Sequence, residues 1–338
     1  MNNTVKVGIA GIGTYFPEQI ETAEALVKPS GIPLEVLQKK MGIIQRHVAS
    51  DDDTISHMAS EASKRAIEDA GIDPAEIKMV ISHGSQHKDH IVWNSAGKIQ
   101  DNIGAVNAFG YEMYALCAGA PIAMNIARSM MIADPALDTV LIAAASREND
   151  LVSLSNPRAR FMYNFGAGGG AMILKRDYDK NLVLGASALT DGSLSETVML
   201  TTEPDAIGDG EMINGEIVGR LDVRNSHYMA HRLNDVSLTN FQRVMREAIE
   251  KSGYTLDDVG FLGITHMKRS AFDSIVEGIG LRPDQAIYLD HYGHIQSIDQ
   301  VLTIQLGLQQ GKIKDGDLIM LAGAGTGYTW SAITVRWG

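Results

Sequence analysis

Hydrophobic residues along this chain fall into two patterns: short continuous runs, and longer stretches in which apolar residues recur with the period of a helix. The continuous runs are rich in Ala, Val, Ile and Gly, and they lack the alternation of a strand that has one face in water. We therefore expect central strands, buried on both faces, at residues 80–81, 140–145, 170–174 and 318–323.

Helical periodicity marks the stretches between these runs. Thr54 precedes one such stretch, Asn240 precedes another, and a third covers residues 298–308. Thr and Asn are favoured N-cap residues, so the first two helices have a plausible start as well as an apolar face. Strands that alternate with helices in this way indicate an α/β fold whose helices cover the sheet.

A weak internal repeat suggests how these elements are organised. Residues 66–71 and 77–82 form a helix end followed by a strand, and residues 248–253 and 259–264 repeat this pattern about 180 residues later. Residues 138–145 and 315–322 are a second pair at nearly the same offset. Two pairs at one offset favour duplication of a mixed α/β unit, and chance likeness between two helix–strand units is the alternative.

The duplication predicts where the chain divides and how its halves stack. A polar stretch at residues 175–180 separates two apolar runs, so we place one half at residues 1–176 and the other at 177–338. Two sheets that each need helices on both faces predict a five-layer α/β/α/β/α sandwich. Its central helical layer would contain the helices that begin at Cys117 and near His294.

Composition narrows the class of protein. The 338 residues are 45% hydrophobic and 21% charged, as expected of a compact globular chain. The formal net charge of −12 argues against a nucleic-acid partner. The N-terminus lacks the plan of a signal peptide, and no apolar stretch reaches the ~18–20 residues that span a bilayer, so we expect a cytoplasmic protein without a membrane partner. A lone cysteine, which cannot form an intrachain disulfide, agrees with a reducing compartment.

That lone cysteine is the leading candidate nucleophile. Cys117 lies where the apolar run 108–116 gives way to the small residues 118–121 that start a helix. The unpaired N–H groups and the dipole at a helix N-terminus stabilise a thiolate. The alternative is a buried, inert cysteine that acts as a small hydrophobic residue.

Two histidines are predicted to lie near Cys117. His294, within residues 292–297, occupies the corner of the second half that corresponds to the Cys117 corner, and His266 follows the repeated strand at the start of a helix. The ordinary histidine pKa of about 6.5 allows such a residue to pair with a thiolate or to donate a proton. A structural or exposed histidine is the alternative at each position.

Four segments, in this order and spacing, resemble the thiolase-fold ketosynthases, and most of all the β-ketoacyl-[acyl carrier protein] synthase III group. These segments are residues 116–119, 265–269, 292–294 and 324–330. Residues 11–17 and 42–47 are similar to the opening segments of that family, and residues 164–169 to its glycine loop, so the resemblance covers nearly the whole chain.

The resemblance implies an acyltransferase of fatty acid or polyketide biosynthesis. Cys117 would form a thioester, and a malonyl-type thioester would lose carbon dioxide and condense with the acyl group. It further implies an oxyanion hole of the Cys117 and Thr326 N–H groups, with Gly325 and Gly327 allowing close approach. His266 and His294, as neutral imidazoles, would donate to the enolate oxygen. No metal and no permanently bound cofactor are implied.

Two departures from the family pattern concern the reaction. Thr326 stands within a motif that is a run of glycines in the family, which is tolerable if only its N–H is used. His294 stands where the synthase III group has asparagine, so the set Cys117, His266 and His294 is similar to that of elongating ketosynthases. The alternative to condensation is a sister activity that moves an acyl group to an alcohol or amine.

A third departure concerns the thioester carrier. Val36 stands where initiating synthases stack coenzyme A on a tryptophan. The carrier would then be the phosphopantetheine of an acyl carrier protein, or coenzyme A held by basic residues. The candidates are Lys39, Lys40, Arg46, Lys268 and Arg269, for which a solvated surface is the alternative.

The resemblance also implies a homodimer. In the family a loop of the partner subunit lines the acyl pocket, and here this loop corresponds to residues 86–94, which are unusually polar. Glu112, Asp89 and His90 are candidates for an additional acid or base near the pocket. A thiolase would need a second cysteine, a hydroxymethylglutaryl-type enzyme a glutamate base, and a non-catalytic partner subunit would lack Cys117.

Overall fold

A nine-stranded sheet forms the framework of the computed structural model, which describes residues 5–201, 212–213, 216–217 and 219–338. The strands lie in the order β13-β14-β15-β8-β1-β7-β6-β4-β5. Their bounds are β1 (Val7–Tyr15), β4 (Met79–Ser82), β5 (Phe109–Glu112), β6 (Thr139–Ser146), β7 (Gly168–Arg176), β8 (Leu182–Thr190), β13 (Val259–Ile264), β14 (Leu318–Gly325) and β15 (Thr329–Arg336). The four predicted central strands are confirmed as parts of β4, β6, β7 and β14, which are almost entirely buried.

The sheet consists of two groups of strands with the same order and pairing. On one side β4 is parallel to β5 and β6, and β7 is antiparallel to both β6 and β1. On the other side β13 is parallel to β14, and β15 is antiparallel to both β14 and β8, while a parallel bridge from Leu262 to Ala286 lies where β5 lies beside β4. The groups join at one register position, Gly8 opposite Leu182. A duplicated unit would produce this order; the boundary after residue 176, between β7 and β8, stays a prediction.

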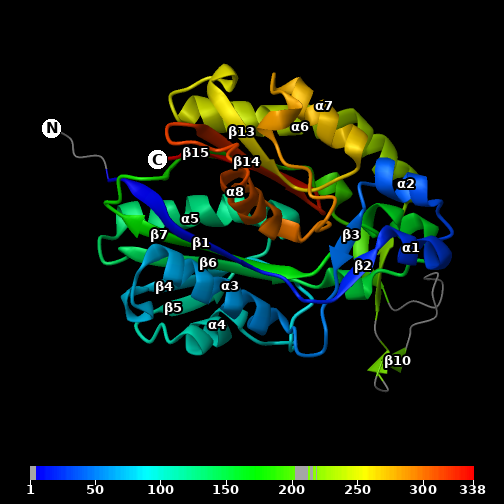
Figure 1. The fold of residues 1–338 in the computed structure, drawn as a ribbon, viewed down its shortest axis with the longest axis horizontal. Helices are drawn as coiled ribbons and strands as arrows, with labels where there is room; N and C mark the ends of the chain where they lie inside the picture. The colour runs from blue at the N-terminus through cyan, green and yellow to red at the C-terminus, as the bar shows by residue number, and fades with distance from the viewer. Residues whose placement is uncertain (1–4, 202–211, 214–215, 218) are drawn as a thin grey trace.

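Helices cover both groups of strands, and the predicted five-layer sandwich is confirmed (Figure 1). Helices α3 (Ile55–Ala70) and α4 (Ser95–Ile103) cover the outer face of the first group. Helices α6 (Ser226–Lys251) and α7 (Arg269–Gly278) lie outside the second group. Between the groups lie α5 (Gly119–Ala133) and α8 (Asp299–Gln309), which contact strands of both, as predicted for the central layer.

The remaining elements flank this sandwich. They are β2 (Ile20–Thr22) with β3 (Gln45–His47), α1 (Ala23–Ser30), α2 (Leu34–Lys39), β9 (Val198–Thr201) with β12 (Arg220–Val223), and β10 (Met212–Ile213) with β11 (Glu216–Ile217). Helix α2 ends close to the start of α7: the Arg269 N–H donates to the Lys40 carbonyl oxygen at 3.2 Å.

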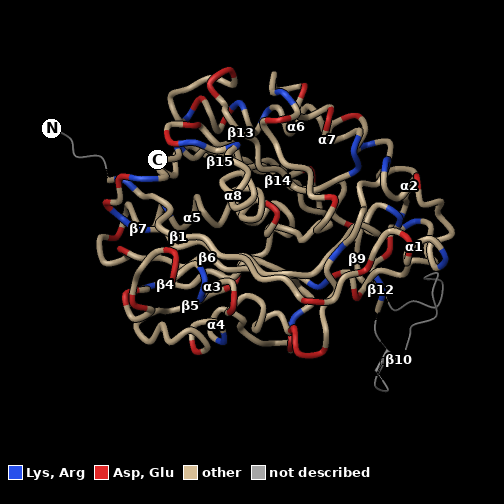
Figure 2. Tube along the Cα trace, in the orientation of Figure 1, with Lys and Arg blue, Asp and Glu red and all other residues tan. Residues whose placement is uncertain are grey.

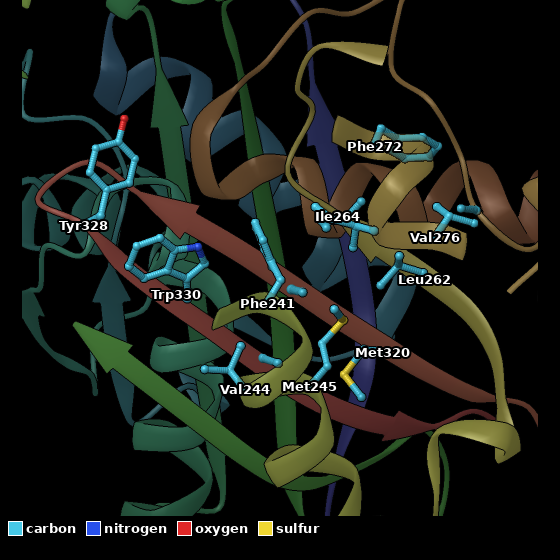
Figure 3. Packing of buried hydrophobic residues seen from close by; sticks show 14 of the residues in the cluster. Phe241, Val244, Met245, Leu262, Ile264, Phe272, Val276, Met320, Tyr328 and Trp330 are labelled. Atoms are coloured by element: carbon cyan, nitrogen blue, oxygen red, sulfur yellow. The ribbon is translucent and has the colours of Figure 1, made fainter. Parts of the chain in front are cut away.

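Three buried apolar clusters fill the spaces between the five layers. One packs α3 and α4 on the first group of strands, and a second surrounds α5 and α8 in the middle. The third packs α6 and α7 on the second group, where Phe241 lies beside the fully buried Trp330 and Phe272 lies near Ile264 and Val276 (Figure 3). Burying a side chain of this size contributes roughly 2–3 kcal/mol. Burial of the same kind in the central cluster fixes the positions of α5 and α8, the two helices at whose N-termini the candidate site residues lie.

The helix starts agree with their predicted caps in one case and differ in another. The Thr54 hydroxyl accepts from the His57 N–H at the start of α3. Helix α6, predicted from residue 240, begins at Ser226, where the Asn225 side chain accepts from the Tyr228 N–H. The first half of α6 is mostly exposed, and its apolar face is reduced to Met229, Leu233 and Val236, which is why the sequence pattern placed its start too late.

The prediction that no apolar stretch is long enough to span a bilayer was wrong. The helical segment Leu116–Ala133 is long and apolar enough, by length and composition, to cross a membrane. Half of its residues are buried, and α5 contacts strands of both groups. A helix of the central layer contacts strands on both sides, so it needs a wide apolar surface and can pass the same composition test as a membrane helix.

Candidate active site

A sharp turn places Cys117 at the N-terminus of α5. The short 3-10 helix Leu116–Ala118 joins the segment after β5 to α5, and Leu116 has a φ of +49°, which is rare for a residue other than glycine. Cys117 is buried, and as the second residue of a helix its N–H lacks a partner within that helix. The predicted corner therefore exists, and the turn is strained, as functional turns often are.

The predicted glycine loop holds His294 in place. The His294 N–H donates to the Asn164 carbonyl oxygen at 2.7 Å, and the His294 carbonyl oxygen accepts from Gly166 at 2.9 Å. Gly293 has a φ of +78°, and a Cβ there would lie 2.5 Å from the Asn164 oxygen, so only glycine fits. The Phe165 ring packs edge-on against the His294 ring at 5.2 Å.

His294 contacts both the candidate nucleophile and a buried carboxylate. Its Nε2 lies 3.0 Å from the Cys117 Sγ, and its Nδ1 lies 2.6 Å from Oδ2 of Asp299, the first residue of α8. Sequence reasoning missed Asp299. The available signal was a lone charge among the apolar residues of a predicted helix, five positions after His294.

Charge at this site differs from the expectation of two neutral imidazoles. Burial disfavours a charged His294, but the Cys117 and Asp299 anions and the hydrogen bonds to them outweigh burial and raise the pKa of His294 well above 6.5. This direction favours a charged ring, whereas the sequence led us to expect a neutral His294. That expectation overlooked the carboxylate, which the sequence does not place beside the ring.

His266 is neutral, as predicted, and lies in the loop between β13 and α7. Burial lowers its pKa to about 4. Its Nε2 lies 3.0 Å from the Gly42 carbonyl oxygen, which can only accept, so Nε2 carries the proton. Its Nδ1 is buried and has no hydrogen-bond partner among the described residues. Helix α7 begins at Arg269, three residues beyond the predicted helix start at His266.

Of the two glycines predicted to approach Cys117, Gly325 does so and Gly327 does not, while the preceding Gly323 also lies against Cys117. A Cβ on Gly325 would lie 2.4 Å from the Ala115 carbonyl oxygen and 3.1 Å from the Cys117 nitrogen. Gly327 has no atom within 4 Å of such a Cβ, so the prediction of close approach is wrong for it, and its φ of +122° is what requires glycine. Thr326 lies between the two, and the role of its N–H stays a prediction.

Gly325→Ala is expected to slow acylation of Cys117 about 100-fold, because the new methyl group would displace the turn that holds the thiol. The rate of acyl-enzyme formation by intact mass measures this effect. Gly192→Ala is the matched control, since a Cβ there meets nothing within 4 Å. An unchanged acylation rate in Gly325→Ala would contradict the role given to this close approach.

Arg46, a predicted carrier ligand, has a structural role instead. Its Nε and Nη2 donate to the Glu21 carboxylate, and its Nη1 donates to the carbonyl oxygens of Tyr163 and Phe165. The guanidinium is buried and all of its nitrogens are engaged. The prediction that Arg46 binds a carrier is therefore wrong, because Arg46 ties β3 to the segment before the glycine loop.

The other basic candidates lie together at the surface. Lys268 and Arg269 are exposed at the start of α7, and Lys39 and Lys40 are exposed at the end of α2 (Figure 2). The Arg269 guanidinium stacks on the Tyr288 ring at 4.7 Å, and this ring packs against His266 at 4.6 Å. We call these four residues the basic cluster; it lies one aromatic ring away from the candidate site.

The predicted partner loop, residues 86–94, is tied to the rest of the protein through Asp89 and Lys88. Asp89 accepts from the Ile55 and Ser56 N–H groups at the start of α3. Glu112 accepts from Lys88 Nζ at 2.9 Å and from the Tyr114 hydroxyl at 2.6 Å. Both carboxylates thus have structural partners. The tip is less polar than the loop as a whole, since Ile91 and Val92 are 93% and 98% exposed.

Comparison with known proteins identifies the family. The model of 3-oxoacyl-[acyl-carrier-protein] synthase III matches residues 111–192, and the model of the C-terminal part of that enzyme matches residues 249–337. A β-ketoacyl-[acyl-carrier-protein] synthase III 1 of Bacillus anthracis is 30% identical over 335 residues, which cover 99% of this chain and 100% of the relative. The chain belongs to the 3-oxoacyl-[acyl-carrier-protein] synthase III family.

Other members agree with this assignment. The β-ketoacyl-[acyl-carrier-protein] synthase III of Thermosynechococcus vestitus is 28% identical over 339 residues, covering 98% of each chain. The crystal structure of the 3-oxoacyl-[acyl-carrier-protein] synthase III of Aquifex aeolicus VF5 has a TM-score of 0.84 at 24% identity, covering 98% of this chain and 100% of that chain. The predicted family and fold are confirmed, and the matched segments contain Cys117, His266 and His294.

Proposed function

We propose that this protein is a 3-oxoacyl synthase that forms an acyl thioester on Cys117 and condenses the acyl group with a malonyl-type thioester, with loss of carbon dioxide. One observation carries the proposal. In a chain of this family, the lone cysteine lies at the N-terminus of α5 with its sulfur 3.0 Å from the Nε2 of His294. A thiol beside an imidazole at a helix N-terminus is suited to nucleophilic attack.

The first half-reaction transfers the acyl group. The Cys117 thiolate attacks the thioester carbonyl carbon, the new carbon–sulfur bond forms, and the bond to the carrier sulfur breaks. The leaving thiolate takes a proton and departs as the free thiol. The Cys117 N–H lies beside Gly325 and lacks a helical partner, which supports its assignment to the oxyanion hole with the N–H of Thr326.

The second half-reaction forms the carbon–carbon bond. The malonyl carboxylate leaves as carbon dioxide, the resulting enolate carbon attacks the acyl carbonyl, and Cys117 is released as a thiolate. We assign the enolate side to His266, because a neutral imidazole in a buried site donates without the cost of a buried charge. Donation from its Nε2 requires that the hydrogen bond to the Gly42 oxygen be exchanged for one to the enolate.

We assign thioester carriers with a phosphopantetheine arm as substrates, on either coenzyme A or an acyl carrier protein, with no permanently bound cofactor. The basic cluster supports this assignment, because it presents cations near His266 on a chain of net charge −12. Phosphate groups and acidic carrier surfaces are attracted to such a local patch.

A homodimer is the proposed assembly, and the cytoplasm the proposed compartment. Strand β5 pairs only with β4 among the described strands, so one of its edges is open. The exposed Ile91 and Val92 extend from the loop that precedes α4. An open strand edge near an apolar loop tip is suited to a second copy of the chain.

The proposal is tested by intact mass. The protein is incubated with acyl-coenzyme A thioesters of graded chain length, and the mass increase of one acyl group is expected on the wild type and absent from Cys117→Ser. Malonyl thioester on coenzyme A or on an acyl carrier protein is then added, and carbon dioxide release with loss of the adduct is expected. If no thioester of the series leaves an adduct, the proposed function is wrong.

The same experiment addresses acyl transfer without condensation. Adduct formation without carbon dioxide release, followed by passage of the acyl group to an added alcohol or amine, would replace condensation by that activity. Simultaneous release of carbon dioxide and a 3-oxoacyl product supports condensation. Both readouts come from one sample, so acylation and condensation are scored separately.

A further inference from the structure

Asp299 is a carboxylate that the synthase reaction proposed above leaves without a role. It is completely buried, and its two oxygens accept three hydrogen bonds. Oδ1 accepts from the Ile295 N–H at 2.8 Å, and Oδ2 accepts from the His266 N–H at 2.7 Å and from His294 at 2.6 Å. A buried carboxylate is costly unless it is paired, so these contacts need an explanation.

We propose that Asp299 is a positioning residue that makes His294, and not His266, the acceptor of the Cys117 thiol proton. The inference rests on the proposed role of Cys117 as the nucleophile. It adds a third member to the Cys117–His294 pair, giving a carboxylate, an imidazole and a thiol in line. This is the arrangement of triads in which the carboxylate orients the base and stabilises its charged form.

The hydrogen bonds fix the tautomer of His294. A carboxylate only accepts, so the Nδ1 of His294, 2.6 Å from Oδ2, carries a hydrogen. The Nε2 of a neutral ring then presents its lone pair to the Cys117 sulfur at 3.0 Å. The ring is held in this orientation because the main chain of His294 is bonded on both sides to the glycine loop.

The proton transfer balances in charge and atoms. The proton leaves Sγ for Nε2, which gives a thiolate and an imidazolium that lies between two anions. When the thiolate attacks a thioester, the same Nε2 proton is available to the departing carrier thiolate, and His294 returns to neutral. The N-terminus of α5 lies beside the sulfur and favours its negative charge.

The other titratable groups that face this pair are neutral, as far as the described residues show. His266 has a pKa of about 4 and its Nε2 proton bonds the Gly42 oxygen. Burial, with the nearby Cys117 charge, raises the pKa of Tyr328, so this hydroxyl keeps its proton. His266 cannot hold the thiol proton at neutral pH, which leaves His294 as the acceptor.

The test measures the thiol directly and needs no acyl substrate. Because Cys117 is the only cysteine, iodoacetamide alkylation followed by intact mass reports on this one sulfur. The rate is measured between pH 5 and 9, and in the wild type it is expected to change little around neutrality, because the Nε2 of His294 lies 3.0 Å from the sulfur and accepts the thiol proton. In Asp299→Asn the rate is expected to fall about tenfold or more at pH 6, and to approach the wild-type rate above about pH 9, where hydroxide deprotonates the thiol.

Two comparisons separate positioning from general support of the fold. Asp179→Asn removes one exposed carboxylate that pairs with Lys6 and is expected to keep the wild-type pH profile. In a His294→Asn background, adding Asp299→Asn is expected to change the alkylation rate no further, because the base that Asp299 orients is already gone. Thermal denaturation of each variant checks that it is folded.

Two results would overturn the inference. One is a wild-type pH profile in Asp299→Asn. The other is an equal loss of alkylation rate when Asp299→Asn is added to the wild type and to the His294→Asn variant. These outcomes are independent of the acyl-coenzyme A experiment. A chain that forms no acyl adduct but shows the expected alkylation profile would refute the proposed function and keep the role of Asp299.

Discussion

Cys117→Ala is expected to abolish acyl transfer, with a loss of about 10⁴-fold or more in the rate of product formation, because no other thiol exists in the chain. The expected mass spectrum shows the unmodified protein at every acyl-coenzyme A concentration. The measurement is the rate of 3-oxoacyl product, together with the mass of the protein before malonyl thioester is added.

Cys117→Ser is the matched comparison for this loss. Serine keeps a hydroxyl beside His294, but an alcohol in this position is a much weaker nucleophile than a thiolate. A Cys117→Ala variant that still forms an acyl adduct would show that the acyl group is carried by another residue. The position of that adduct, found by peptide mass, would then identify the true nucleophile.

His294→Ala is expected to lower kcat/KM for condensation by about 10³-fold, and to slow acylation as well as the decarboxylative step. Removal of the ring takes away the group that contacts the sulfur and leaves Asp299 buried without its charged partner. Acylation is measured by intact mass and condensation by carbon dioxide release. The geometry changes the expectation based on sequence alone, in which His294 served only the enolate.

His291→Ala is the control, since His291 is exposed in the same loop and bonds only to Asp290 among the described residues. His294→Asn adds information, because it installs the residue that the resemblance in the sequence leads us to expect at this position. Should His294→Ala acylate at the wild-type rate and fail only in decarboxylation, His294 would belong to the enolate side, and the assignment of the thiol proton to it would be wrong.

The sequence predicted the framework of the site because that framework depends on local patterns. Continuous apolar runs mark strands buried on both faces, and the small residues around Cys117 mark a tight strand-to-helix turn. The repeat then placed Cys117 and His294 at corresponding corners of the two halves. These inferences need only periodicity and offset, which a single chain displays.

The remaining features depend on which distant side chains meet. Arginine side chains are usually exposed. Arg46 is buried nevertheless, because Glu21 and two carbonyl oxygens from a different segment accept its hydrogen bonds. Asp299 reads as an ordinary first residue of a helix until the fold brings His266 and His294 to it. The charge of His294 follows from that contact, so the sequence could not supply it.

The reacting groups belong to opposite sides of the sandwich. Cys117 follows β5 in the first group of strands, whereas His266, His294 and Asp299 follow strands of the second group. The two groups share one register position and the central helices. Neither group of strands by itself positions all the reacting atoms. Activity therefore requires that the two groups be correctly packed against each other.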